Sequence, residues 1–234
     1  MEERSRLFAE EIQATLDGVL PGERLIVSRA FEDSGRHIVQ PQGAAAVDRR
    51  VPILVDGDHL ADLSLSLYLG ADRSGGYLKT VRSDVAVHSV LDRTPLLRLE
   101  YRADMREAPI AHWQIHAERG AFSHLLARAH AHRLGRVGRP HDLASLHLPV
   151  GGERFRPCLE DVLQFLVVDC GVDHEPGWKA VVDDGREAWR RRQLRSTVRD
   201  SRAETARAMR EMGWTITQPP QAGPPENLRA FTTW

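Results

Sequence analysis

The sequence predicts an α+β protein, with an antiparallel meander sheet in its N-terminal half followed by helices. Hydrophobic residues recur with period two through most of residues 25–117 and with helical spacing from about residue 121 to 212. The predicted strands are joined by connections too short for helical crossovers, which favours antiparallel pairing. The 234 residues suffice to bury a core. We expect one domain over residues 1–217 and a Pro-rich C-terminal tail over 218–234.

The strand predictions rest on alternation and on turn signals. A strand series begins at Leu25, and the Asp56-Gly57 pair is typical of a tight turn between two strands. The clearest strand covers residues 61–69, where leucine and alanine alternate with polar residues, so that one face is buried and the other is wet. The other predicted strands cover residues 51–55, 78–90, 95–103 and 109–117.

The helices are predicted from apolar stripes and from their end signals. An amphipathic helix is expected over residues 3–17, ended by Gly18. Pro157 suits the first position of a second helix, which Gly171 would end. A long Arg-rich helix is expected over residues 186–212. A short helix over 121–133 and a last strand over 143–150 complete the order.

Composition excludes several classes of protein. The chain has 32 Lys and Arg residues and 33 Asp and Glu residues, so it lacks the globally basic character of a dedicated nucleic-acid binder. No apolar run approaches the ~20 residues that a membrane span needs, and the charged start has no signal-peptide core. Two cysteines make no disulfide framework. We therefore expect a cytoplasmic protein without a membrane partner.

Motifs for cofactors and for common hydrolases are missing. The sequence has no phosphate-loop, dinucleotide-binding, nucleophile-elbow or H-E-x-x-H motif, so no cofactor is expected. Seven of the eleven histidines fall between His112 and His147, and His112 and His116 have H-x-x-x-H spacing. On a strand that spacing spans about 13 Å, too far for two imidazoles to share one metal ion. The alternation of Trp113 and Ile115 favours a strand, and a metal centre remains only the third hypothesis.

The two strands around this histidine pair suggest an acid–base site. Leu97, Leu99 and Tyr101 alternate with Arg98, Glu100 and Arg102, and a short connection leads to the histidine strand. The register cannot be read from the sequence. If the two polar faces coincide, they form one wet surface of Arg98, Glu100, His112, Gln114 and His116.

Such a set fits a ribonuclease that needs no metal ion. A carboxylate and an imidazole can act as general base and general acid, and an arginine can stabilise phosphoryl charge. The leading acid–base candidate is His112, followed by Glu100 and His116, with Arg98 as the phosphate group. A solvated sheet face with an incidental ion pair, or a surface for a ligand or partner, is the alternative.

Part of the chain resembles TumE-type toxin proteins of toxin–antitoxin pairs. The resemblance covers about residues 50–118 and rests on the order of the strands, on Arg98 with Tyr101, and on His112 with His116. It implies a component of a toxin–antitoxin or phage-defence system.

The Arg-rich helix supports a second hypothesis. Ten cationic residues and six carboxylates lie between residues 178 and 212. Helical spacing predicts a basic ridge of Arg191, Arg195, Arg199 and Arg202. This ridge could follow an RNA backbone, bind an acidic partner protein, or remain solvated and self-paired, as Glu187 and Arg191 suggest. The alternative function is therefore a non-catalytic module that oligomerises or binds a partner protein through this helix.

Overall fold

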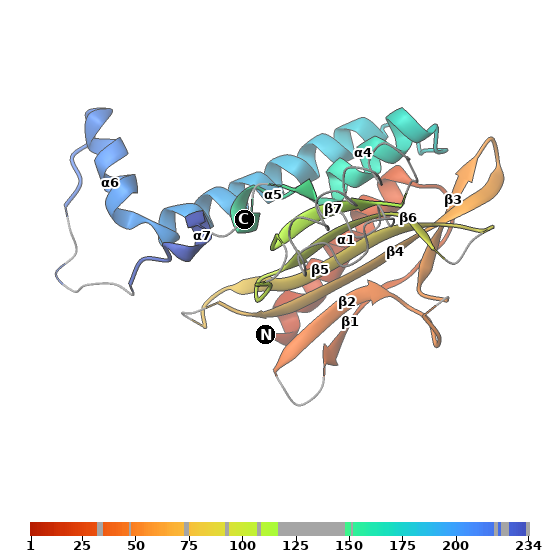
Figure 1. Ribbon diagram of the computed structural model, residues 1–234, viewed down its shortest axis with the longest axis horizontal. Coiled ribbons are helices and arrows are strands. Elements are labelled where there is room, and N and C mark those ends of the chain that lie inside the picture. The colour runs from red at the N-terminus through yellow and green to blue at the C-terminus, as the bar shows by residue number, and fades with distance from the viewer. Residues whose placement is uncertain are drawn as a thin grey trace, which may run out of the picture.

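The computed structural model has the predicted α+β architecture, with an antiparallel sheet followed by helices (Figure 1). It describes residues 1–31, 35–46, 48–72, 75–91, 94–106, 109–116, 148–150, 152–217, 220 and 225–232. The strands are β1 (Ile26–Phe31), β2 (Arg36–Pro41), β3 (Arg50–Val55), β4 (Asp58–Ala71), β5 (Leu78–Ser89), β6 (Pro95–Arg102), β7 (Ala111–Ile115) and β8 (Leu148–Pro149). The helices are α1 (Glu2–Val19), α3 (Gly152–Phe155), α4 (Leu159–Cys170), α5 (Trp178–Asp200), α6 (Arg202–Glu211) and α7 (Arg229–Thr232).

The sheet is a meander from β3 to β7, because each of these strands pairs antiparallel with the next one along the chain. The first hairpin departs from this order. Strand β2 pairs with β4 at Val39↔Leu67, and β3 pairs with the other half of β4 at Val51↔Leu63. The length of β4 lets one strand hold two neighbours on the same edge.

The predicted turn at Asp56-Gly57 is confirmed. Both residues have positive φ, 52° and 80°, as the tight hairpin turn between β3 and β4 requires. The alternation along β4 is also confirmed, since Leu63, Leu65 and Leu67 are buried on one side.

One side of the sheet is covered by helices. Figure 1 shows α1, α4 and α5 together on this side, and buried residues of α1, α4 and the sheet form a single apolar core. This core includes buried leucines from each of these parts, such as Leu16 of α1, Leu163 of α4 and Leu65 of β4. We call the opposite side, which carries the polar residues of β4 to β7, the polar face.

The first helix is longer than predicted. It runs through Gly18 to Val19, so the glycine does not end it. A Cβ atom at Gly18 would lie 2.9 Å from Cγ2 of Val181 on α5. The glycine therefore allows close approach of the two helices.

The helix α4 begins two residues later than predicted. Cys158, not Pro157, precedes its first turn, and the Asp161 carboxylate accepts a hydrogen bond from the Cys158 backbone N–H at 3.0 Å. Gly171 ends the helix in the left-handed conformation at φ 66°, as predicted.

The predicted helix over residues 186–212 is two helices. Helix α5 begins earlier, at Trp178, and ends at Asp200, and α6 begins at Arg202. Ser201 between them has φ −137° and ψ 83°, outside the helical region. Figure 1 shows α6 leaving the line of α5 and projecting beyond the end of the sheet.

Several predictions lie outside the described residues. These are the helix over 121–133, most of the strand over 143–150, and the histidines from 124 to 147. In the Pro-rich segment, the described part contacts the helices. The Asn227 backbone N–H donates to the Asp200 carbonyl at 2.8 Å, and the Ala203 N–H donates to the Glu226 carboxylate at 2.7 Å.

Candidate functional site

The register of β6 and β7 places the predicted polar residues on one face. Glu100 lies directly opposite His112, and Arg98 lies opposite Gln114. Their strands are neighbours because the short connection after Arg102 closes a hairpin. His112 lies within β7, which confirms the prediction that this segment is a strand and not a helix.

His112 is buried rather than wet, with 1% of its surface exposed. Its Nδ1 lies 2.8 Å from the Pro109 carbonyl oxygen, and its Nε2 lies 3.4 Å from Oε2 of Glu100. Each ring nitrogen therefore lies near a hydrogen-bond acceptor, one from the backbone and one from the neighbouring strand. The alternation of β7 indicated the face on which His112 lies, but not that this face is covered there.

Glu100 connects the predicted residues. The hydrogen bond from His112 lowers the pKa of Glu100, partial burial opposes this shift, and the charge of Arg98 supports it. Nη1 of Arg98 lies 3.7 Å from Oε1 of Glu100. The Glu100 side chain keeps 22% of its surface exposed, so the carboxylate remains accessible from the polar face.

Asp84 joins this group from β5. It lies directly opposite Glu100, so Asp84, Glu100 and His112 form a row across three strands, which we call the acidic row. Arg82 donates a hydrogen bond from Nε to the Asp84 carboxylate at 2.6 Å. Burial raises the pKa of Asp84, the charge of Arg82 opposes this shift, and the charge of Glu100 supports it.

The two carboxylates of the row therefore have pKa values shifted in opposite directions. Such a pair is typical of sites where one carboxyl group donates a proton and the other accepts one. Sequence reasoning missed Asp84. Only its face could be predicted, because Val85 and Val87 are apolar and Asp84 alternates with them onto the polar side.

His116 lies apart from the row. The backbone N–H of His116 donates to the Leu96 carbonyl at 2.9 Å, which places it four residues along β6 from Glu100. That separation is about 13 Å on a strand. The charge of His116 contributes to lowering the pKa of His88, after the larger effects of burial and of two arginines. The structure thus brings together Arg98, Glu100 and His112, but not His116.

The four arginines of the predicted basic ridge have different surroundings. Arg191 forms an ion pair with Glu187 at 2.7 Å on the exposed side of α5. Arg195, Arg199 and Arg202 line a cavity instead, and Arg202 belongs to α6. The prediction of one continuous basic ridge is therefore wrong, because the helix is interrupted at Ser201.

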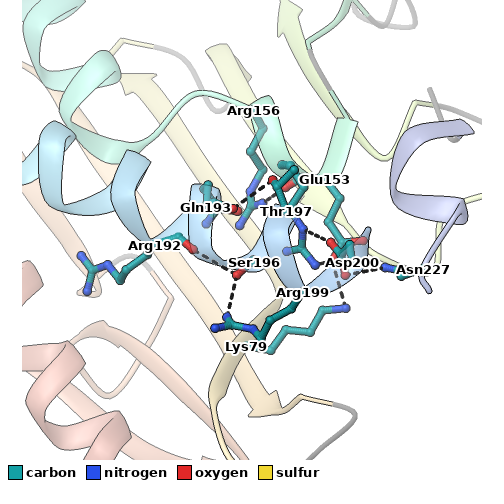
Figure 2. A network of polar contacts seen from close by, with 11 residues as sticks. Lys79, Glu153, Arg156, Arg192, Gln193, Ser196, Thr197, Arg199, Asp200 and Asn227 are labelled. Atoms are coloured by element: carbon teal, nitrogen blue, oxygen red, sulfur yellow. Dashed lines mark hydrogen bonds and ion pairs between the residues drawn. The ribbon is translucent and has the colours of Figure 1, made fainter. Parts of the chain in front are cut away.

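A polar network connects α5 with α3, β5 and the C-terminal segment beside this cavity (Figure 2). Asp200 accepts a hydrogen bond from Nε of Arg154 at 2.6 Å and another from Nδ2 of Asn227 at 3.2 Å. Glu153 pairs with Lys79 at 3.1 Å and with Arg154 at 3.2 Å. Four segments of the chain are joined here by ion pairs and hydrogen bonds.

Within the part of the chain that the structure describes, no group of three or more His, Cys, Asp or Glu side chains is close enough to hold a metal ion. No helix among those residues has the length and apolar character to cross a membrane. No known protein family, curated protein or solved structure matches the chain.

Proposed function

We propose that the acidic row is an acid–base site that cleaves RNA without a metal ion, as a component of a toxin–antitoxin or phage-defence system would. The observation that supports this most strongly is the pairing of Asp84 with Glu100 across β5 and β6, with pKa values shifted in opposite directions. Arg82 and Arg98 flank the pair and keep part of their side chains exposed, as groups that contact a phosphate must.

The proposed reaction uses the ribose as its nucleophile. Glu100 accepts the proton of the 2′-hydroxyl, and the 2′-oxygen forms a bond to phosphorus. The bond from phosphorus to the 5′-oxygen breaks, and protonated Asp84 gives its proton to that oxygen. Arg82 and Arg98 stabilise the additional negative charge on the phosphoryl oxygens. The products are a 2′,3′-cyclic phosphate and a 5′-hydroxyl end.

In this proposal His112 is a positioning residue. Its burial keeps it from a large substrate, and its contact holds the Glu100 carboxylate ionised and in place. This role replaces the sequence-based expectation that His112 itself transfers the proton. Glu100 and Arg98 keep the roles expected of them, and Asp84 is added.

We expect the purified full-length protein to cleave single-stranded RNA in the presence of EDTA. Mass spectrometry should find 2′,3′-cyclic phosphate ends, and an all-deoxy oligonucleotide of the same sequence should stay intact. Asp84→Asn, purified identically, should cut at least about a hundredfold more slowly, because it cannot donate the proton. Asp62→Asn changes the same charge on the same face, outside the row, and should cut at the normal rate. Intact RNA across pH 4–8, or equal cleavage by Asp84→Asn, would rule out this function.

A second candidate function is self-association through the C-terminal helical region. Helix α6 has no buried residue, and Met212 and Trp214 directly after it are exposed apolar side chains. Apolar residues at the end of a projecting helix favour contact with a second copy of the chain. They also provide a surface for a partner protein, the other occupant that the sequence suggested.

If a second copy binds there, light scattering coupled to gel filtration should give the mass of a dimer. Trp214→Glu should give the mass of a monomer, because a charge replaces the apolar contact. Leu91→Glu provides the matched control, since Leu91 is an apolar residue with 93% of its surface exposed in the turn after β5. A monomer at all concentrations, or a dimer unaffected by Trp214→Glu, would exclude this interface.

A further inference from the structure

A cavity of about 690 Å³ lies on the helix-covered side of the sheet, away from the acidic row. Its walls come from α1, α5, the ends of β4 and β5, and the segment around α3. Small-molecule sites in proteins occupy roughly 300–1,000 Å³. The cavity therefore has the size of a site for a ligand such as a mononucleotide.

The lining has an excess of positive charge. Eight lining residues are arginine or lysine, and three carry carboxylates. Three of the cations have a carboxylate partner, because Glu153 pairs with Lys79, Asp200 pairs with Arg154, and Glu11 pairs with Arg192. Arg156, Arg195 and Arg199 have no carboxylate within ion-pair distance among the residues that the structure describes.

Arg156 is the most informative of these three. It is buried, with 8% of its surface exposed, and its Nη1 donates a hydrogen bond to the Glu153 carbonyl oxygen. Its guanidinium carbon lies 3.8 Å from the centre of the Tyr101 ring and 5.6 Å from that of Trp189. Figure 2 shows the side chain extending toward Gln193 on α5. A buried guanidinium normally has an anionic partner, and this one faces a cavity without one in the described chain.

Two other buried polar atoms line the same cavity. Tyr101 Oη and Gln193 Oε1 have no hydrogen-bond partner among the described residues. Burial raises the pKa of Tyr101 to about 12, so the hydroxyl keeps its proton and remains a donor. Unsatisfied buried polar atoms are costly, and several of them around one cavity indicate that a polar ligand completes them.

The rest of the lining fits a planar group. Trp189, Tyr77 and Phe8 contribute aromatic surface. Arg199 extends over the Tyr77 ring, with its guanidinium carbon 4.4 Å from the ring centre. Arginines beside aromatic rings are the combination that binds a phosphate together with a nucleobase.

We propose that this cavity is a binding site for a nucleoside monophosphate, whose phosphate group contacts Arg156, Arg195 and Arg199. The base lies against the aromatic residues of the lining, and Tyr101 Oη donates to the ligand. This site does not depend on the proposed RNA cleavage, because it uses other residues on the other side of the sheet.

Isothermal titration calorimetry of the full-length protein with AMP, GMP, CMP and UMP tests the site. At least one nucleotide should bind with one molecule per chain. It should bind at least about tenfold more tightly than inorganic phosphate or its own nucleoside, because each lacks half of the contacts. Equal binding of phosphate alone would show an anion site without a base pocket, and equal binding of the nucleoside would remove the phosphate contact. Either result would overturn the proposal, and so would an absence of binding by all four nucleotides at millimolar concentration.

Substitutions locate the binding. Arg195→Gln, a substitution at an exposed position of α5, should weaken nucleotide binding about tenfold. Arg156→Gln should weaken it about a hundredfold in samples that circular dichroism shows to be folded. Arg191→Gln removes the same charge from α5 outside the cavity, so it should bind like the unaltered protein. Equal affinity of Arg195→Gln and Arg191→Gln would place the ligand elsewhere.

Discussion

Glu100→Gln is expected to slow RNA cleavage about a thousandfold, within the range typical for loss of a general base. Glutamine keeps the size of the side chain and can still accept a hydrogen bond, but it cannot remove the 2′-hydroxyl proton. The partner strands should keep their register, because Leu99 and Tyr101 on either side are buried in the core. Initial rates with a fluorescent oligoribonucleotide in EDTA measure the effect.

The pH dependence of the unaltered protein provides a second readout of the same residue. On the acid side, the rate falls as Glu100 takes up a proton, and His112 holds this pKa below its ordinary value. On the alkaline side, the rate falls as Asp84 loses its proton, and burial holds that pKa above its ordinary value. A bound phosphate is an anion, so it raises the pKa of Asp84 further. The rate should therefore have its maximum at acidic pH.

At acidic pH the free energy of unfolding is also expected to fall as Glu100 takes up a proton. A loss of folded protein must therefore be distinguished from a loss of catalytic rate. Because the folded-state pKa of Glu100 is lowered, its contribution to folding is present above its unfolded-state pKa and is lost as the pH falls through its folded-state pKa. Circular dichroism at each pH distinguishes unfolding from protonation of the base.

Two further variants make the Glu100 prediction specific. His112→Gln keeps the base but removes the imidazole whose hydrogen bond lowers the pKa of Glu100, so the acid side of the pH profile should move to higher pH. Asp62→Asn should leave both limbs in place. If Glu100→Gln cleaves RNA within threefold of the normal rate, or if His112→Gln leaves the acid limb unmoved, the acidic row does not perform this chemistry.

The sequence could predict the hairpin that carries this site because burial allows one arrangement. Leu97, Leu99 and Tyr101 must face the core, so Arg98 and Glu100 point to the other side with the polar residues of the next strand. The alternation of apolar and polar residues within one strand determines which face of the sheet each side chain takes. It does not determine which strands pair with one another, because that depends on segments distant in the sequence.

For that reason the role of Asp84 could not be predicted. Its strand gives its face, but its position opposite Glu100 depends on the pairing of β5 with β6, which is irregular at Val87/His88. Two predictions about helices were wrong for a related reason. Helix α1 does not end at Gly18, and the helix predicted over residues 186–212 is interrupted at Ser201. Gly18 lies against Val181 of α5, a tertiary contact that the sequence does not show. Ser201 followed by Glu204 fits the S-x-x-E pattern of a helix start, but the helical spacing that continues across residues 186–212 masked this signal.

The cavity is the feature least visible in the sequence. Tyr101 and Arg156 meet there from a strand and from the segment before α4. No motif or period connects these positions, because tertiary packing alone brings them together. Spacing along α5 correctly grouped Arg195 with Arg199, but gave no sign that they line a cavity together with cations from other elements.

Asp200→Ala is expected to lower the free energy of unfolding by about 3 kcal/mol, the order typical for breaking a buried ion pair from one side. Asp200 is buried at the end of α5, where its carboxylate accepts hydrogen bonds from Arg154 and Asn227. Among the described residues, alanine leaves the Arg154 guanidinium with Glu153 as its remaining carboxylate partner. It also removes the side-chain bond that holds the C-terminal segment. Urea unfolding followed by tryptophan fluorescence measures the loss.

Asp183→Ala is the matched control, because it removes a carboxylate from the same helix at an exposed position. Asp183 pairs with the exposed Lys179 and with Arg186, and its own carboxylate is half exposed, so water and salt screen these pairs. Its effect should be small and should shrink as salt is added, whereas the effect of Asp200→Ala should persist. If the two variants unfold at the same urea concentration, the network around Asp200 does not hold α3, α5 and the C-terminal segment together, and the walls of the cavity have another source of rigidity.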